Sequence, residues 1–154
     1  MNAPIQSGLE LRWFLPLFVL GWCGIIAFLS LIGGWHALSK RYRAVQPVQG
    51  RLFAFASMGL GRSFFPVSYG SCLFVRVGAA GIGLSIFPIY RILHPPLFIP
   101  WSAAAECKRE KFWWFTHTAV YLTDFQTRIL FTGRLGRAIY ESWTSEHLQV
   151  QPSR

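Results

Sequence analysis

The stretch CLFVRVGAAGIGLSIFPIY, residues 72–90, decides how the second half of the chain folds, because its apolar length suits either a membrane span or two strands. Arg76 would cost about 2.5 to 3.5 kcal/mol at the centre of a bilayer, and the glycines and Pro88 weaken a helix. On both sides of the GAAG turn, apolar residues recur at every second position, which is the period of a half-buried strand. The stretch therefore predicts a β-hairpin, with a second membrane-spanning helix as the alternative. The residues predicted to share its buried face are Leu73, Val75, Val77, Ile82, Leu84 and Ile86.

Other runs of strand-like composition flank this hairpin and predict a small antiparallel sheet or barrel. They cover residues 50–57, 96–101, one or two strands within 111–124, and 127–133. Pro100 inside its run indicates an edge strand or a bulge. From Arg134 to about Glu146 the period changes, because Leu135, Ile139 and Trp143 fall at i, i+4 and i+8. This spacing predicts an amphipathic helix that lies on the core.

The N-terminal part contains a run from Trp13 to Trp35 without any Asp, Glu, Lys, Arg or His. As a helix this run would be about 33 Å long, close to the hydrocarbon thickness of a bilayer, so it predicts a transmembrane helix. Trp13 and Trp35 stand where an aromatic belt would place an anchor at each membrane surface. A cleaved signal peptide is the alternative. Its apolar region is usually about 7 to 15 residues long and follows a basic segment, whereas here Glu10 precedes Arg12.

Basic residues gather after this run. Lys40, Arg41 and Arg43 follow it, whereas Arg12 is the one basic side chain before it. The positive-inside rule therefore predicts a single-pass protein of the inner (cytoplasmic) membrane with its C-terminal domain in the cytoplasm. Near an anionic leaflet each cation is worth about 1 kcal/mol, so the three residues are also expected to bind anionic phospholipid. The simpler interpretation is that they only set the orientation.

These patterns predict an α+β chain: one N-terminal transmembrane helix, then a small antiparallel β-barrel or sandwich closed by a C-terminal amphipathic helix. The predicted boundaries are a short tail at 1–12, the transmembrane helix at 13–35, a basic juxtamembrane linker at 36–49, the β domain with its helix at 50–148, and a second tail at 149–154.

The composition agrees with one domain beside a membrane. A chain of 154 residues has room for one ordinary core, and 53% of the residues are apolar while only 14% are charged. The formal net charge of +9 indicates an anionic neighbour, for which nucleic acid is the weakest candidate once the chain is tethered to a membrane. The cysteines, Cys23, Cys72 and Cys107, have neither disulfide nor zinc-site spacing and fit a reducing compartment.

The stretch GIGLSIFPIYRILHPPLFIPWSAA resembles a strand pair of bacterial membrane-anchored pleckstrin-homology-like (GRAM-type) domain proteins of unknown function, many of which carry an apolar N-terminal helix. The resemblance covers residues 51–143 and is most specific at 83–85 and 99–102. One departure is that Ala103, and not an acidic residue, follows the WS pair. The resemblance implies a domain that binds lipids, peptides or proteins and that is not a catalyst.

Motifs for catalysis are few. The glycines of GAAGIG are spaced G-x-x-G-x-G before a strand-like run, whereas a dinucleotide site needs G-x-G-x-x-G opening a helix. His117 is the best catalytic candidate, but a strand residue with hydrogen-bonded neighbours is the favoured interpretation. His94 precedes Pro95 and Pro96, where a role in a turn suffices. We therefore expect no catalytic residue, no cofactor and no metal.

Two segments are candidates for contact with lipid. The run ECKREK, residues 106–111, is expected to connect two strands and to place Lys108, Arg109 and Lys111 as a headgroup clamp beside Trp113 and Trp114. A solvated loop is the alternative. The loop at 57–71, with Phe64 and Phe65, is expected either to dip into the membrane interface or to cover the core of the domain.

The sequence thus predicts a membrane-anchored, non-enzymatic binding module on the cytoplasmic face, which engages anionic phospholipid or a protein partner. The alternative is an accessory subunit of a larger membrane complex. Its helix would pack against other spans through Gly21, Gly24 and Ala27, small residues that let helices approach closely. An enzyme is the third and least favoured hypothesis.

Overall fold

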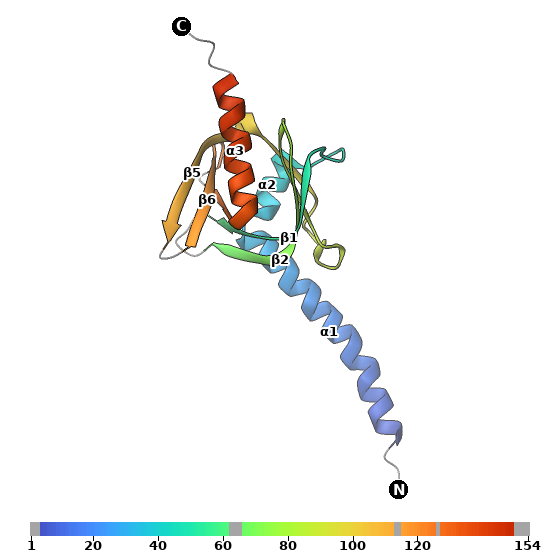
Figure 1. The fold of residues 1–154 in the computed structure, drawn as a ribbon. Helices are drawn as coiled ribbons and strands as arrows, with labels where there is room; N and C mark the ends of the chain where they lie inside the picture. Colours follow the sequence, from blue (N-terminus) through green and yellow to red (C-terminus); the bar gives the residue numbers. More distant parts are fainter. Residues whose placement is uncertain (1–3, 62–65, 113–114, 126, 150–154) are drawn as a thin grey trace.

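The computed structural model describes residues 4–61, 66–112, 115–125 and 127–149, and Figure 1 shows a long helix that leaves one end of a β domain. The elements in chain order are α1 (Pro4–Ile32), α2 (Trp35–Tyr42), β1 (Arg51–Gly61), β2 (Val67–Val77), β3 (Gly81–Ile86), the 3-10 turn η1 (Pro88–Tyr90), β4 (Leu97–Pro100), the 3-10 turn η2 (Trp101–Ala103), β5 (Ala104–Phe112), β6 (Phe115–Leu122), β7 (Arg128–Thr132) and α3 (Gly133–Gln149).

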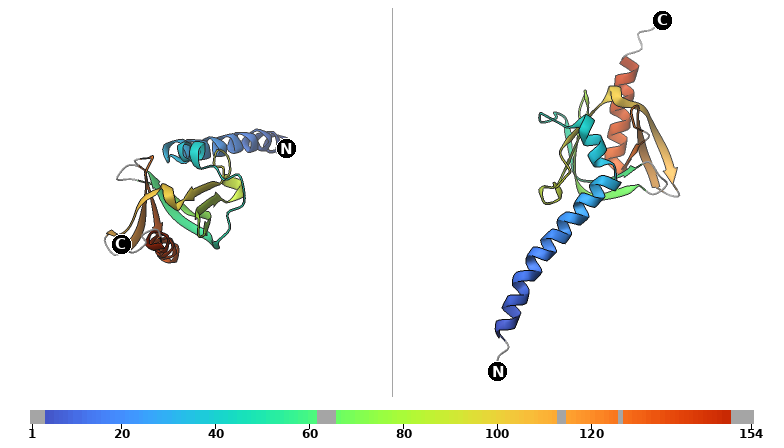
Figure 2. Two further views of the ribbon diagram at one scale, coloured as in Figure 1. Left: turned by 90° about the horizontal axis from the view of Figure 1, so that it is seen from above. Right: turned by 180° about the vertical axis from the view of Figure 1, so that it is seen from behind.

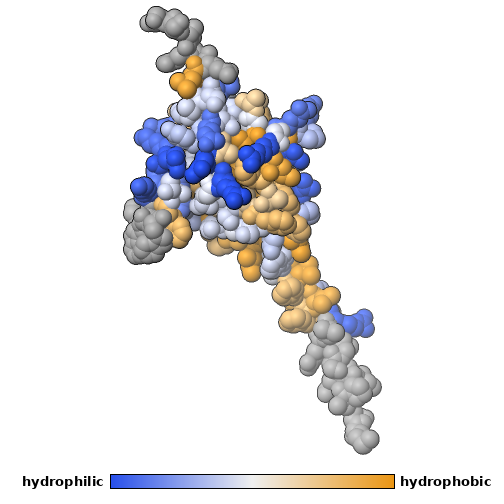
Figure 3. Space-filling model, viewed as in Figure 1, coloured by the Kyte–Doolittle hydropathy of each residue, from blue (hydrophilic) through white to orange (hydrophobic). Residues whose placement is uncertain are grey.

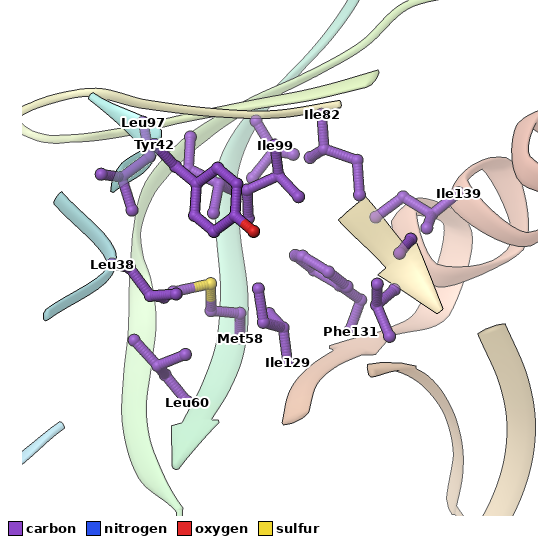
Figure 4. Close-up of a cluster of buried hydrophobic side chains, with 14 of the residues drawn as sticks. Leu38, Tyr42, Met58, Leu60, Ile82, Leu97, Ile99, Ile129, Phe131 and Ile139 are labelled. Atoms are coloured by element: carbon purple, nitrogen blue, oxygen red, sulfur yellow. The ribbon is translucent and has the colours of Figure 1, made fainter. Parts of the chain in front are cut away.

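The strands form one curled antiparallel sheet, a half-barrel, in the order β4-β3-β2-β1-β7-β6-β5. Seen from above, α2 and α3 lie on opposite sides of the strands (Figure 2). Both helices contribute to one core, in which Leu38 and Tyr42 of α2 and Ile139 of α3 belong to the same buried cluster as Met58 and Phe131 (Figure 4). The prediction of an α+β chain with an N-terminal apolar helix and a C-terminal helix is confirmed.

The hairpin predicted at residues 72–90 is present as β2 and β3, so the alternative of a second membrane span is wrong. Leu73 lies opposite Ile86, and Val77 lies opposite Ile82, with all four side chains buried. Gly83 of β3 is needed for close packing, because a Cβ there would lie 2.7 Å from the Cβ of Val48. The period-two pattern thus determined both the strands and their buried face.

The predicted transmembrane helix at 13–35 ends earlier than expected. Helix α1 stops at Ile32, and Gly34 adopts a left-handed φ of 80°, a conformation that suits glycine. The chain then enters α2, in which Trp35, Leu38 and Tyr42 face the core. The side chain of Trp35 is fully buried, and its Nε1 donates a hydrogen bond of 3.0 Å to the carbonyl of Pro95. The prediction that Trp35 anchors a membrane surface is therefore wrong, because the ring has no surface left for a headgroup.

The predicted linker at 36–49 is also shorter than expected. Its first seven residues belong to α2. The buried positions of this helix, Leu38 and Tyr42 among them, flank the exposed cations Lys40 and Arg41, so the sequence did not show a helical pattern. Residues 43 and 44 then pair with the outer edge of β4, where Arg43 forms a bridge with Leu97 and the amide of Ala44 donates to Pro96 across 2.9 Å. The edge position predicted for the strand that contains Pro100 is confirmed.

Two predicted loops need correction. The run 106–111 is not a connection but the middle of β5, an edge strand that pairs with β6 from Ala104 to Phe112. The loop expected at 57–71 is mostly strand, since β1 continues to Gly61 and β2 begins at Val67. The side chains expected to enter the interface there, Phe64 and Phe65, lie outside the described residues, as do Trp113 and Trp114.

The C-terminal helix forms as predicted. Helix α3 packs on β5, β6 and β7, with Leu135 and Ile139 buried and Trp143 partly buried against the core. Nε1 of Trp143 donates to the carbonyl of Ala104 at 3.4 Å.

Candidate functional site

Helix α1 offers the largest exposed apolar surface of the described chain. Its segment Arg12–Ile32, 21 residues, is long and apolar enough to cross a membrane. Leu17, Leu20 and Ile25 are each more than half exposed. Figure 3 shows this apolar surface continuing from the helix onto one side of the domain, with hydrophilic side chains on the opposite side and at the edge of the apolar area.

The predicted membrane anchor Trp13 and the predicted helix-packing residues of α1 differ in how exposed they are. Trp13, at the N-terminal end of the candidate span, is 69% exposed and remains available as an anchor. A Cβ added at Gly21 or Gly24 would meet no atom within 4 Å, so this part of the helix surface is open. Ala27, by contrast, is partly buried. Its role in helix packing stays a prediction, as do those of the two glycines.

The basic residues at the end of α2 and just after it differ in their surroundings. Nη2 of Arg41 lies 2.8 Å from Oδ2 of Asp124, and the hydroxyl of Tyr42 donates to the same oxygen at 3.1 Å. Lys40 and Arg43 are exposed. Arg41 is therefore engaged with Asp124, whereas Lys40 and Arg43 form no ion pair with the described residues.

The basic residues of β5 form a second surface. Nζ of Lys108 pairs with Oε1 of Glu106 at 2.7 Å on the surface, an interaction worth little in water. Arg109 and Lys111 are exposed and form no ion pair with the described residues. We call Arg109 and Lys111 the β5 basic surface.

The six predicted contact residues do not form one cluster. The turn that contains Asp124, the partner of Arg41, lies beside the beginning of β5, since the amide of Thr123 donates to Ala103 across 3.0 Å. From Ala104 to Lys111 the strand extends about 23 Å. The basic end of α2 and the far end of β5 are thus separated by most of the strand, because β5 runs away from that turn.

A buried polar group at the junction of α1 and the domain was missed by the sequence analysis. His94 is 1% exposed, and its Nδ1 lies 2.9 Å from the carbonyl of Ile92. Since a carbonyl only accepts, Nδ1 carries the proton, and Nε2 accepts from the hydroxyl of Tyr69 at 3.3 Å. Burial lowers the pKa of His94 and raises the pKa of Tyr69. The sequence around His94 has no periodic pattern that predicts its burial. The two prolines that follow it indicate only a turn.

Chemically reactive groups are scarce in the described part of the chain. His117 lies in β6 opposite Glu110 and Thr132, and its Nδ1 is buried without a described hydrogen-bond partner. Burial raises the pKa of Cys107 to about 11, so its thiol is protonated at neutral pH. No group of three or more His, Cys, Asp or Glu residues among those described could hold a metal ion.

The chain matches no family model, and comparisons with curated proteins and with solved structures give no match. The resemblance to pleckstrin-homology-like domains therefore stays a prediction.

Proposed function

We propose that this chain is a membrane-anchored, non-enzymatic binding module. Its α1 helix spans the membrane once, and its β domain stands on the cytoplasmic face, in the inner membrane of a bacterium. The observation that carries the proposal is the exposed apolar surface of Arg12–Ile32, which is followed after two glycines by α2, a helix with one face in the core of the domain. A soluble protein would leave this surface in water at a large cost in free energy.

The connection between anchor and domain is short and well packed. The amide of Gly33 donates to Leu29 at 2.9 Å, and a Cβ at Gly33 would lie 2.9 Å from the hydroxyl of Tyr69. Oγ of Ser30 donates to the carbonyl of Leu93 at 2.6 Å. These contacts support a domain held in one orientation on its anchor, rather than one that swings on a flexible linker.

The charge of the domain supports an anionic ligand. The net charge is +9, and the ion pairs of the described residues engage only Arg41, Lys108 and Arg128. The β5 basic surface is our candidate for contact with anionic phospholipid or an acidic protein face, because its two exposed cations lie on one edge strand and form no ion pair with the described residues. The cations that follow the span also favour the cytoplasmic orientation of the domain.

An accessory subunit of a larger membrane complex is the second candidate. It is favoured by the open surface around Gly21 and Gly24, where another helix could approach closely. Purification in mild detergent distinguishes the two. A lone module elutes as a monomer or small oligomer, whereas a subunit elutes with stoichiometric partners that a Gly21→Leu, Gly24→Leu variant loses.

Anchoring and orientation can be tested together in cells. We expect the full chain to stay in the membrane fraction after carbonate extraction. A single cysteine introduced near residue 154, in a variant without Cys23, Cys72 and Cys107, should react with an impermeant maleimide only after the membrane is opened. Release by carbonate would refute the anchor, and labelling of intact cells would refute the orientation.

The ligand class is tested with the full chain anchored in neutral nanodiscs. We expect it to capture added anionic vesicles at 0.1 M salt and to lose them at 1 M, where the Debye length falls to about 3 Å. An Arg109→Glu, Lys111→Glu variant should lose this capture. The matched control is Arg134→Glu, Arg137→Glu, which changes the net charge equally at two exposed positions of α3. Equal loss in both variants would show that total charge, and not the β5 basic surface, is responsible.

A further inference from the structure

The loop between β3 and β4 exposes more apolar surface than a loop in water normally does. In residues 87–93, FPIYRIL, the side chains of Phe87, Ile89, Ile92 and Leu93 are between 41% and 60% exposed. Arg91 is the one charged residue of this segment. A contiguous apolar loop of this kind marks a contact with a membrane or a protein.

This loop lies against the C-terminal part of α1. The ring of Tyr90 is 5.7 Å from that of Trp22, and the carbonyl of Leu93 accepts the hydrogen bond from Ser30. Ile26, one turn before Ser30, is only 5% exposed. Trp22 precedes Ile32 by ten residues, which is about 15 Å along the helix. The loop therefore runs beside the last turns of the candidate span and not above its end.

We propose that residues 87–93 form a second membrane contact, which inserts into the cytoplasmic leaflet beside α1. The proposal rests on the proposed function, because it takes α1 as the anchor. A bilayer that surrounds α1 up to Ile32 must also surround a loop that is held against Trp22 and Ser30. The apolar surface seen in Figure 3 is continuous at this place, from α1 to the adjoining side of the domain.

The backbone of the loop suits a medium with little water. The amide of Phe87 donates to Cys72 at 2.8 Å, that of Tyr90 to Phe87 at 2.9 Å, and that of His94 to Arg91 at 3.0 Å. Side chains satisfy three further carbonyls. His94 donates to Ile92, Ser30 to Leu93, and Trp35 to Pro95. Polar backbone groups without partners would oppose insertion, and here most have partners within the protein.

The position of Arg91, the charged residue of the loop, agrees with insertion of the loop beside the last turns of α1. Arg91 lines an open hollow together with His36 and Arg43, which come from α2 and the segment after it. A long cationic side chain at the membrane surface extends toward the phosphates while its stem stays among apolar groups. The hollow would thus lie at the level of the headgroups.

Depth-dependent fluorescence quenching tests the proposal in the full chain. In a variant without native cysteines, single cysteines at Ile89, Leu20 and Val45 are labelled with an environment-sensitive dye. The protein is reconstituted in nanodiscs of pure phospholipid, with quenchers placed either near the headgroup or deep in the acyl chains. Leu20 reports on the anchor, and Val45, which is 94% exposed, reports on the water-facing part of the domain. Circular dichroism confirms that each variant keeps the β domain.

We expect the label at Ile89 to be quenched several-fold more by the shallow quencher than the label at Val45, and the label at Leu20 to be quenched by the deep one. If Ile89 behaves like Val45 while Leu20 is quenched, the loop faces water or a protein and the inference is wrong, although the anchor stands. If Leu20 is not quenched either, the proposed anchor itself is wrong. A label at Ile92 serves as the second site, and it must agree with Ile89 for the inference to hold.

Discussion

The hydroxyl of Tyr69 and Nε2 of His94 are joined by a hydrogen bond of 3.3 Å, which ties β2 to the loop that lies against α1. Trp35 packs on both rings, with centroid distances of 5.4 Å to Tyr69 and 5.2 Å to His94. Residues from α2, β2 and the loop before β4 thus meet in one buried group. This group connects the β domain to the end of α1.

This arrangement predicts a stability that depends on pH. The pKa of His94 is lowered in the folded protein, so the unfolded chain takes up its proton first as the pH falls below about 6.5. Stability from this group is therefore complete above that pH and is lost as the pH falls toward the lower pKa of the folded state. We expect the melting temperature in detergent to fall between pH 7 and pH 5. His94→Gln should reduce this dependence, whereas His147→Gln, on the surface of α3, should preserve it. An unchanged slope in His94→Gln would contradict the assignment.

The two tryptophans at the ends of the predicted span should differ in their effects. Trp35→Ala removes a fully buried ring and should destabilise the domain by about 3 to 5 kcal/mol. Trp13→Ala, at an exposed position of α1, should leave the unfolding of the domain unchanged. Denaturant titration followed by circular dichroism at β-sheet wavelengths measures both. Similar destabilisation by the two substitutions would argue against the buried position of Trp35.

The smallest folding unit should begin within α1. A chain that starts at Val45 lacks Trp35, Leu38 and Tyr42, all of which belong to the core, and we expect it to remain unfolded. A chain that starts at Ile26 keeps them, together with Ser30, and should give the β-rich circular dichroism spectrum of the full domain. Cooperative melting of the shorter chain would show that α2 is dispensable.

A glycine pair tests the packing of the sheet. Gly83→Ala would place its Cβ 2.7 Å from the Cβ of Val48 and should destabilise the domain by about 1 to 3 kcal/mol. Gly70→Ala, in neighbouring β2, meets no atom within 4 Å and should change stability little. Adding Val48→Gly should restore part of the loss in Gly83→Ala, whereas Val48→Ala keeps the clashing Cβ and should restore less. Equal effects of Gly83→Ala and Gly70→Ala would contradict the close approach.

The chain by itself determined the features that depend on neighbouring residues. The charge-free run predicted α1, the alternation in residues 72–90 predicted the hairpin and its buried face, and the change of period after Arg134 predicted α3. Each of these patterns is complete within a few turns or one strand, because helices and strands repeat over short distances. The order of the strands and their curl do not follow from such patterns.

Only the tertiary structure decided which polar and aromatic residues are buried. It also decided which basic residues lie close together on the surface. Trp35 resembled a membrane anchor until its hydrogen bond to Pro95, 60 residues away in the chain, placed it in the core. His94 resembled a turn residue until its contact with Tyr69, 25 residues away, placed it in the same buried group. The environments of Trp35 and His94 are set by segments that are distant in sequence, and a local pattern carries no information about which distant side chains will fold against it.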